Sequence, residues 1–106
     1  MLVTKHNKYD IVSVKITSGE EIVGGFVECS ESLKLRKPLA LTMTGDGPAL
    51  MPYFMTGDTI YDVQEVEFNL NTVVSIIKTH KPFADAYTQS TGGLDLSAGK
   101  DKSLII

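Results

Sequence analysis

Apolar and polar residues alternate along the first third of the chain, which is the pattern of strands with one buried and one solvated face. Val12, Val14 and Ile16 are each separated by one polar residue, so they would share one face of a strand. Ser18-Gly19 follows them and predicts a turn, because glycine adopts a positive φ without a steric clash. The same pattern over the whole chain predicts strands at about residues 10–17, 21–29, 33–43, 49–55, 64–69 and 72–78.

Glycine and proline residues predict that these strands bend. The pair Gly24-Gly25 lies inside the second strand, where glycine usually marks a bulge or a sharp bend. Pro38 interrupts the third strand, and the turn-forming residues 44–48 predict the tip of a hairpin. The β-branched run at residues 72–78 is typical of a strand covered on both faces. Six or so short, bent strands with almost no helix predict a small all-β barrel.

The end of the chain has a different composition. Pro82 suits the first position of a helix, and the apolar spacing behind it predicts a short helix over residues 82–89. Beyond Ser90 the sequence is rich in glycine, serine and charged residues, which is typical of a flexible tail. We therefore expect one β-domain over residues 1–90 and a tail over residues 91–106.

Composition places the chain among single globular domains. Its 106 residues are 42% hydrophobic and 22% charged, as in ordinary water-soluble proteins. No apolar run approaches the roughly 18 residues that span a bilayer, and the first residues lack a signal-peptide pattern. Cys29 is the single cysteine, so no intrachain disulfide forms. A cytoplasmic location without a membrane partner is the expectation.

The side chains that usually carry enzyme chemistry are sparse. His6 and His80 are the only histidines, and neither stands at metal-ligand spacing from a second ligand. Cys29 lies between Glu28 and Glu31, where negative charge disfavours a reactive thiolate. No glycine-rich phosphate loop is present. The sequence therefore predicts no enzymatic activity, no metal site and no cofactor.

The charge balance does not by itself indicate nucleic-acid binding. The net charge is −3, whereas nucleic-acid-binding domains usually carry a basic excess. Lys34, Arg36 and Lys37 form the densest basic cluster. Its simplest interpretation is a solvated strand face, although a ring of several copies would concentrate such charges on one side.

The order of these features resembles the Sm motif of Sm-like (LSm) proteins. The first half of that motif is matched by a strand, the turn Ser18-Gly19-Glu20-Glu21, a glycine-bent strand, Glu28 and then Leu33-Lys34-Leu35. Its second half falls on residues 68–76, where the apolar frame matches. Asn69 and Leu70 occupy the places of the usual Arg-Gly pair. Two later segments, residues 49–53 and 87–93, are similar to small Sm-like proteins of tailed phages of marine cyanobacteria.

The resemblance implies a fold and an assembly. The fold would be a small, strongly bent, five- to six-stranded antiparallel Sm-like (SH3-type) barrel with a short C-terminal helix and a flexible tail. Copies would pair head to tail through the late strands, at residues 49–55 and 73–77, and close into a homo-oligomeric ring. The expected subunit-interface residues are Leu50, Tyr53, Val74 and Ile76.

The resemblance also implies a place for single-stranded RNA, between the loop after the second strand and the turn before the last strand. Carried over by position, the candidate RNA-binding residues are Glu28, Ser32, Lys34, Asn69 and Asn71. The same polar residues are ordinary turn formers.

Two functions from different classes therefore stay open. The first is a ring-forming Sm-like protein that binds single-stranded RNA or an RNA-associated partner. The alternative is a homo-oligomeric structural or protein-interaction module, in a phage, with no nucleic-acid role. A third possibility is a monomer whose apolar late strands fold inward against the helix at residues 82–89.

Overall fold

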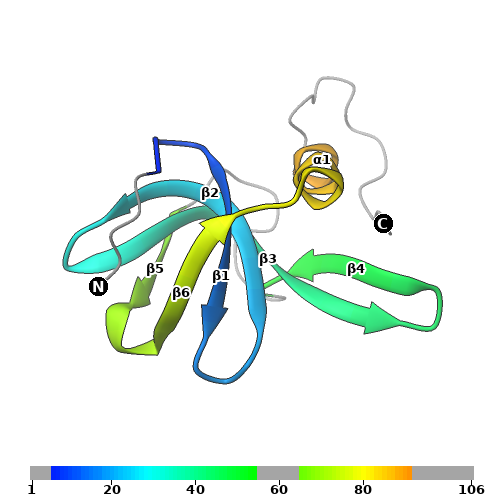
Figure 1. Ribbon diagram of the computed structural model, residues 1–106, viewed down its shortest axis with the longest axis horizontal. Coiled ribbons are helices and arrows are strands. Elements are labelled where there is room, and N and C mark those ends of the chain that lie inside the picture. The colour runs from blue at the N-terminus through cyan, green and yellow to red at the C-terminus, as the bar shows by residue number, and fades with distance from the viewer. Residues whose placement is uncertain (1–5, 55–64, 92–106) are drawn as a thin grey trace.

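The structure, a computed structural model, describes residues 6–54 and 65–91, and these residues form six strands and one α-helix (Figure 1). The strands are β1 (Ile11–Ile16), β2 (Glu21–Cys29), β3 (Ser32–Thr44), β4 (Gly47–Pro52), β5 (Glu65–Asn69) and β6 (Val73–Lys78). A 3₁₀ turn (Leu70–Thr72) joins β5 to β6, and the helix α1 (Lys81–Ser90) follows β6. The prediction of a mostly β chain with one short helix after the last strand is confirmed.

All six strands belong to one antiparallel sheet. Its strand order is β4-β3-β2-β1-β6, and β5 pairs with β3 beside this path. The sheet is not closed within the described residues, because β6 pairs only with β1. The outer edges of β4, β5 and β6 are therefore without a partner strand in the part of the chain that the structure describes.

The long strand β3 holds both β4 and β5 on the same edge. Arg36 of β3 lies opposite Glu65, and Leu39 lies opposite Pro52. Tyr53 donates its backbone N–H to the carbonyl oxygen of Pro38 at 3.1 Å, between these two ladders. β4 and β5 thus pair with successive parts of β3, like two halves of one interrupted strand. The hairpin formed by the end of β3 and β4 projects from the rest of the sheet (Figure 1).

The predicted bend at Gly24 and Pro38 is confirmed. Between the pairs Val23–Leu39 and Gly25–Arg36, one residue of β2 faces two residues of β3, which is a β-bulge. A Cβ added at Gly24 would lie 3.2 Å from the Cβ of Leu35, so the close approach of the two strands leaves little room for a side chain here.

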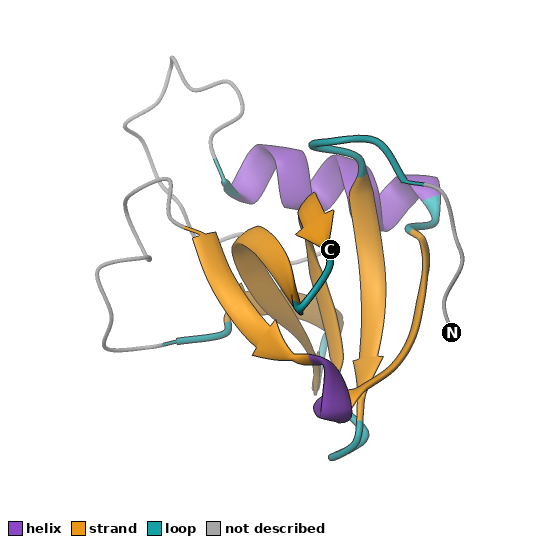
Figure 2. Ribbon diagram, turned by 90° about the vertical axis from the view of Figure 1, so that its left-hand side faces the viewer, coloured by secondary structure: helices purple, strands orange, loops and turns teal. Residues whose placement is uncertain are grey.

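Two apolar clusters lie on opposite faces of the sheet. The larger, the inner core, contains the alternating residues of β1 and is made of Val12, Val14, Ile16, Ile22, Leu33, Leu35, Phe68 and Ile76. The smaller, the helix-side core, lies under α1 and contains Val23, Leu39, Leu50 and Tyr87. Figure 2 shows α1 lying across the strands on this second face. The helix predicted at residues 82–89 extends one residue further at each end, and Pro82 lies in its first turn.

The expectation that the last strand is covered on both faces is wrong for the single chain. Only Ile76 of β6 is buried, whereas the side chains of Val74 and Ile77 are 58% and 61% exposed. A β-branched run has the same appearance in a central strand and in an apolar edge strand. β6 is an edge strand, so its second face and its outer edge meet solvent.

Some predictions fall outside the described residues. These are the tail from residue 92 onward, and residues 55 and 64 at the ends of two predicted strands.

Candidate functional site

The sheet brings two separate turns together at one end. The register of β3 and β5 places Ser32, beside the β2–β3 turn, directly opposite Asn69, beside the 3₁₀ turn. Asn71 lies within that 3₁₀ turn and is exposed. Three of the five candidate RNA-binding residues therefore lie at the same end of the sheet, where the resemblance places them.

Asn69 uses its side chain to shape the turn. Its Oδ1 accepts a hydrogen bond from the backbone N–H of Asn71 at 2.9 Å, which caps the 3₁₀ turn. Thr72 Oγ1 donates to the carbonyl oxygen of Asn69 at 2.7 Å. The turn-forming role considered for these residues is thus present in the structure, and the acceptor oxygen of Asn69 is engaged.

Lys34 is surrounded by carboxylates. Its Nζ lies 3.2 Å from Oε2 of Glu28 and 3.8 Å from Oε2 of Glu67, which faces it across the β3–β5 ladder. The hydrogen bond and the charge of Glu28 raise the pKa of Lys34, and the charges of Glu67 and Glu65 act in the same direction. Glu28 and Glu67 give the immediate surroundings of Lys34 a negative balance, which disfavours a nucleic-acid phosphate at that position.

The four residues expected at a subunit interface differ in exposure. Leu50 is buried in the helix-side core and Ile76 in the inner core. Tyr53 is half-buried, and its ring centroid lies 5.4 Å from that of Phe68. Val74 alone among the four is exposed. The position of Leu50 under α1 also matches the monomeric alternative for this part of the late strands.

Of the three unpaired edge strands in the described sheet, β5 and β6 carry charged residues, whereas β4 carries none. β5 exposes Glu65 and Glu67 and carries no cation, whereas β6 exposes Lys78 and carries no acid. Val74 and Ile77 add exposed apolar surface on β6. The two edges therefore differ in charge sign, and the apolar surface lies on the basic one.

Groups with catalytic potential are dispersed over the described residues. The ring of His6 packs 5.5 Å from that of Phe26, and His80 precedes α1 with its ring 6.5 Å from that of Phe83. Cys29 is exposed. Residues 6–54 and 65–91 contain no group of three or more His, Cys, Asp or Glu side chains arranged to hold a metal ion. Within the same ranges, no helix has the length and apolar character needed to cross a lipid bilayer.

A shallow pocket opens on the helix side, beside the start of α1. Its volume is about 170 Å³, below the range typical of small-molecule sites. Ser13 Oγ and Thr79 Oγ1 share a hydrogen bond of 2.8 Å there. The pocket is lined by Ser13, Glu21, Val23, Leu41, Ile77, Thr79, His80 and Phe83.

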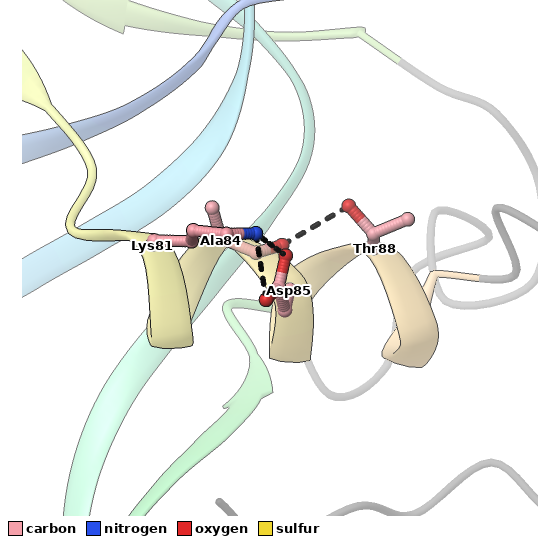
Figure 3. A network of polar contacts seen from close by, with 4 residues as sticks. All are labelled: Lys81, Ala84, Asp85 and Thr88. Atoms are coloured by element: carbon pink, nitrogen blue, oxygen red, sulfur yellow. Dashed lines mark hydrogen bonds and ion pairs between the residues drawn. The ribbon is translucent and has the colours of Figure 1, made fainter.

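The outer surface of α1 is occupied by contacts within the helix. Lys81 Nζ lies 3.3 Å from Oδ2 of Asp85, one turn further along, and Thr88 Oγ1 donates to the carbonyl oxygen of Ala84 at 3.0 Å (Figure 3). An ion pair four residues apart, such as Lys81–Asp85, stabilises a helix by a few tenths of a kcal/mol.

Searches of family models and of curated proteins give no match to this chain. Any functional assignment therefore depends on the geometry of its own residues. In that geometry the turn end of the sheet and the edge of β6 are places that the sequence anticipates, whereas the sequence puts the second assembly edge at residues 49–55 and not on β5.

The sequence pattern missed one cluster, in which Lys8 and Arg36 both lie over the ring of Tyr9. Tyr9 and Arg36 are distant in sequence and come together only because the segment before β1 crosses beside β2. No local spacing could have indicated this contact.

Proposed function

We propose that this protein is a self-assembling β-module of the Sm-like type, whose copies pair head to tail through the edges of β5 and β6. The observation that carries the proposal is the open sheet, with unpaired backbone edges on β5 and β6 in the described residues. Unpaired edges with apolar side chains are surfaces on which other strands add. The exposed Val74 and Ile77 on β6 supply such side chains.

Charge favours pairing of unlike edges. Two β5 strands side by side would bring Glu65 and Glu67 of one copy near the same carboxylates of the other, which is unfavourable. A β5 strand beside β6 instead places these acids near a strand that ends in Lys78. Because the contact joins two different surfaces, it is heterologous, and it gives a closed ring when the rotation between copies closes.

The strand order supports the Sm-like interpretation. The two halves of the motif fall on β1–β3 and on β5–β6, and the sheet makes these segments neighbours through the β3–β5 and β1–β6 ladders. The β-bulge at Gly24 bends β2, and such local bending is compatible with a small, strongly curved sheet. The proposed role is assembly, and it assigns no enzymatic activity to the chain.

Light scattering after size exclusion tests the assembly. The wild-type protein should have a mass several times that of one chain, which is 11.5 kDa. Val74→Asp should give the single-chain mass while keeping its β-type circular dichroism, because Val74 is 58% exposed and its loss opens no cavity. Val74→Thr keeps the shape without a charge and should assemble as the wild type does.

A single-chain mass for the wild type at micromolar concentration would refute the proposal. Ile76→Asp is unsuitable as an interface test, since it places a carboxylate in the inner core and would unfold the chain.

A second candidate function is single-stranded RNA binding at the turn end of the sheet. The placement of Ser32 opposite Asn69 favours it, because two polar turns then offer hydrogen-bonding groups to one ligand. In this case short U- or A-rich RNA would bind with an affinity that falls steeply with salt, and Asn71→Ala would weaken it. Equal binding by Asn71→Ala and wild type would exclude this site.

A further inference from the structure

A cation–aromatic cluster lies just before β1. The Cζ of Arg36 lies 4.9 Å from the centroid of the Tyr9 ring, and the Nζ of Lys8 lies 5.3 Å from the same centroid. The side chain of Tyr9 is 52% exposed, so much of its ring surface remains open to a ligand. Two cations and an open ring thus share one small surface, which we call the Tyr9 platform.

The backbone around the Tyr9 platform is fixed from two sides. Tyr9 donates its N–H to the carbonyl oxygen of Phe26 at 2.6 Å, which ties the segment to β2. The carbonyl oxygen of Arg36 accepts a hydrogen bond of 2.6 Å from the buried hydroxyl of Tyr87. Side chains on a fixed backbone lose less conformational entropy when they bind a ligand, so the platform is partly organised in advance.

Backbone strain is concentrated at the same place. Tyr9 has a φ of 74° and Lys37 a φ of 45°, and they are the only non-glycine residues with positive φ among those that the structure describes. One forms the platform and the other follows Arg36 directly. Strained residues persist only where the surrounding structure holds them, and they cluster at functional sites.

Arg36 differs from Lys34 in its freedom to bind. Arg36 forms no ion pair with any residue in the described ranges, whereas Lys34 is paired with Glu28 and lies near Glu67. Of the acids near the platform, Glu65 lies across the ladder from Arg36. Asp10 accepts a hydrogen bond from the N–H of Asn7 at 2.9 Å. Among the described residues, no carboxylate is paired with the guanidinium, so its N–H donors can face an external anion.

We propose that Tyr9, Arg36 and Lys8 form a binding site for nucleotides of a single-stranded nucleic acid. A base stacks on the exposed surface of the Tyr9 ring or on the Arg36 guanidinium, and the adjoining phosphate binds Arg36 and Lys8. This combination fits a nucleotide, because its base can stack on an aromatic ring and its phosphate can bind the two cations. A simple anion would contact only the cations, and an apolar ligand would contact only the ring. The site shares no residue with the turn end of the sheet, and it does not require a ring.

Fluorescence anisotropy with a short labelled oligouridylate tests the site. Tyr9→Asn removes the ring, while asparagine tolerates the left-handed backbone better than most residues, so the fold is retained. The affinity should fall about 5- to 150-fold, the range expected for the loss of one stacked base. Tyr9→Phe keeps the ring and should bind as the wild type does.

Charge variants separate this site from general attraction. Arg36→Gln should weaken binding and reduce the slope of log affinity against log salt by about 0.7, the share of one phosphate contact. Lys81→Gln removes the same charge from the start of α1 and should leave both quantities unchanged. Absence of binding by the wild type, wild-type affinity in Tyr9→Asn, or equal losses in Arg36→Gln and Lys81→Gln would each overturn the proposal.

The assembly proposal is judged separately, by light scattering on the same samples. A monomeric wild type that binds the oligonucleotide through Tyr9 would refute assembly and support the Tyr9 platform. An oligomer that binds no oligonucleotide would do the reverse.

Discussion

Replacement of Tyr87 by phenylalanine should change how the stability of the protein depends on pH. The Tyr87 side chain is only 6% exposed, and its hydroxyl donates a 2.6 Å hydrogen bond to the carbonyl oxygen of Arg36. Burial raises the pKa of this hydroxyl from 10.0 to about 12, although the backbone of Gly25 and the charge of Arg36 act in the opposite direction. The folded chain therefore holds this proton to higher pH than the unfolded chain does.

The direction and the size of the effect follow from proton linkage. Since the folded pKa lies above the unfolded one, the stabilisation is complete below about pH 10 and is lost as pH rises through about 12. At 1.36 kcal/mol for each pKa unit, the total loss is on the order of 3 kcal/mol. About half of that loss should be reached near pH 11.

Tyr87→Phe removes both the hydrogen bond and the titrating proton. Near neutral pH the variant should be less stable by about 1 kcal/mol, the usual net value of one hydrogen bond. Above about pH 10 the wild type loses stability that the variant keeps, so the two stability curves should cross near pH 11. At about pH 12 the variant should be the more stable protein.

Urea unfolding followed by circular dichroism measures both proteins across this pH range, at one protein concentration so that any self-association is held constant. The difference between the two proteins cancels the titration of every group that they share. Stability curves that stay parallel from neutral pH to about pH 12 would show that the Tyr87 hydroxyl is not held in its protonated form by burial.

Two further substitutions test the bend of the sheet and the cap of the 3₁₀ turn. Gly24→Ala should lower the free energy of unfolding by about 1–3 kcal/mol, because the new Cβ would lie 3.2 Å from the Cβ of Leu35. Gly45→Ala, with no atom within 4 Å, should stay within about 0.5 kcal/mol of the wild type in the same urea titration, and equal effects would contradict the steric reasoning. Asn69→Ala should cost about 0.5–1 kcal/mol in thermal unfolding, since the N–H of Asn71 loses its acceptor, whereas Asn69→Asp keeps that acceptor. A loss of the same size in Asn69→Asp would argue against the cap.

The strands and the helix could be predicted because their signals are local. Val12 and Val14 are completely buried with a polar neighbour between them, which is the arrangement their alternation indicates. Gly24 lies at the bulge of β2, where the next strand approaches too closely to leave much room for a side chain. Period-2 burial and glycine geometry act over a few neighbouring residues, so the sequence carries them directly.

The positions of some candidate RNA-binding residues at the turn end of the sheet could also be predicted. The resemblance to the Sm motif selects Ser32 and Asn69, and the β3–β5 register places them opposite each other. The resemblance did not indicate that Glu67 would lie beside Lys34 together with Glu28, because cross-strand neighbours depend on the register of the whole sheet. The negative balance of this surface is therefore a property of the folded chain.

The amino-acid sequence alone determined that this chain forms short, bent, mostly antiparallel strands followed by one helix. Its periodicity could not distinguish an apolar edge strand from a central one, so the exposure of Val74 and Ile77 on β6 was decided by the tertiary structure. The same holds for the contact of Tyr9 with Arg36, which the path of the segment before β1 creates. The physical reason is that burial patterns are set by each residue and its near neighbours, whereas edges and long-range contacts depend on which strands the complete sheet leaves unpaired.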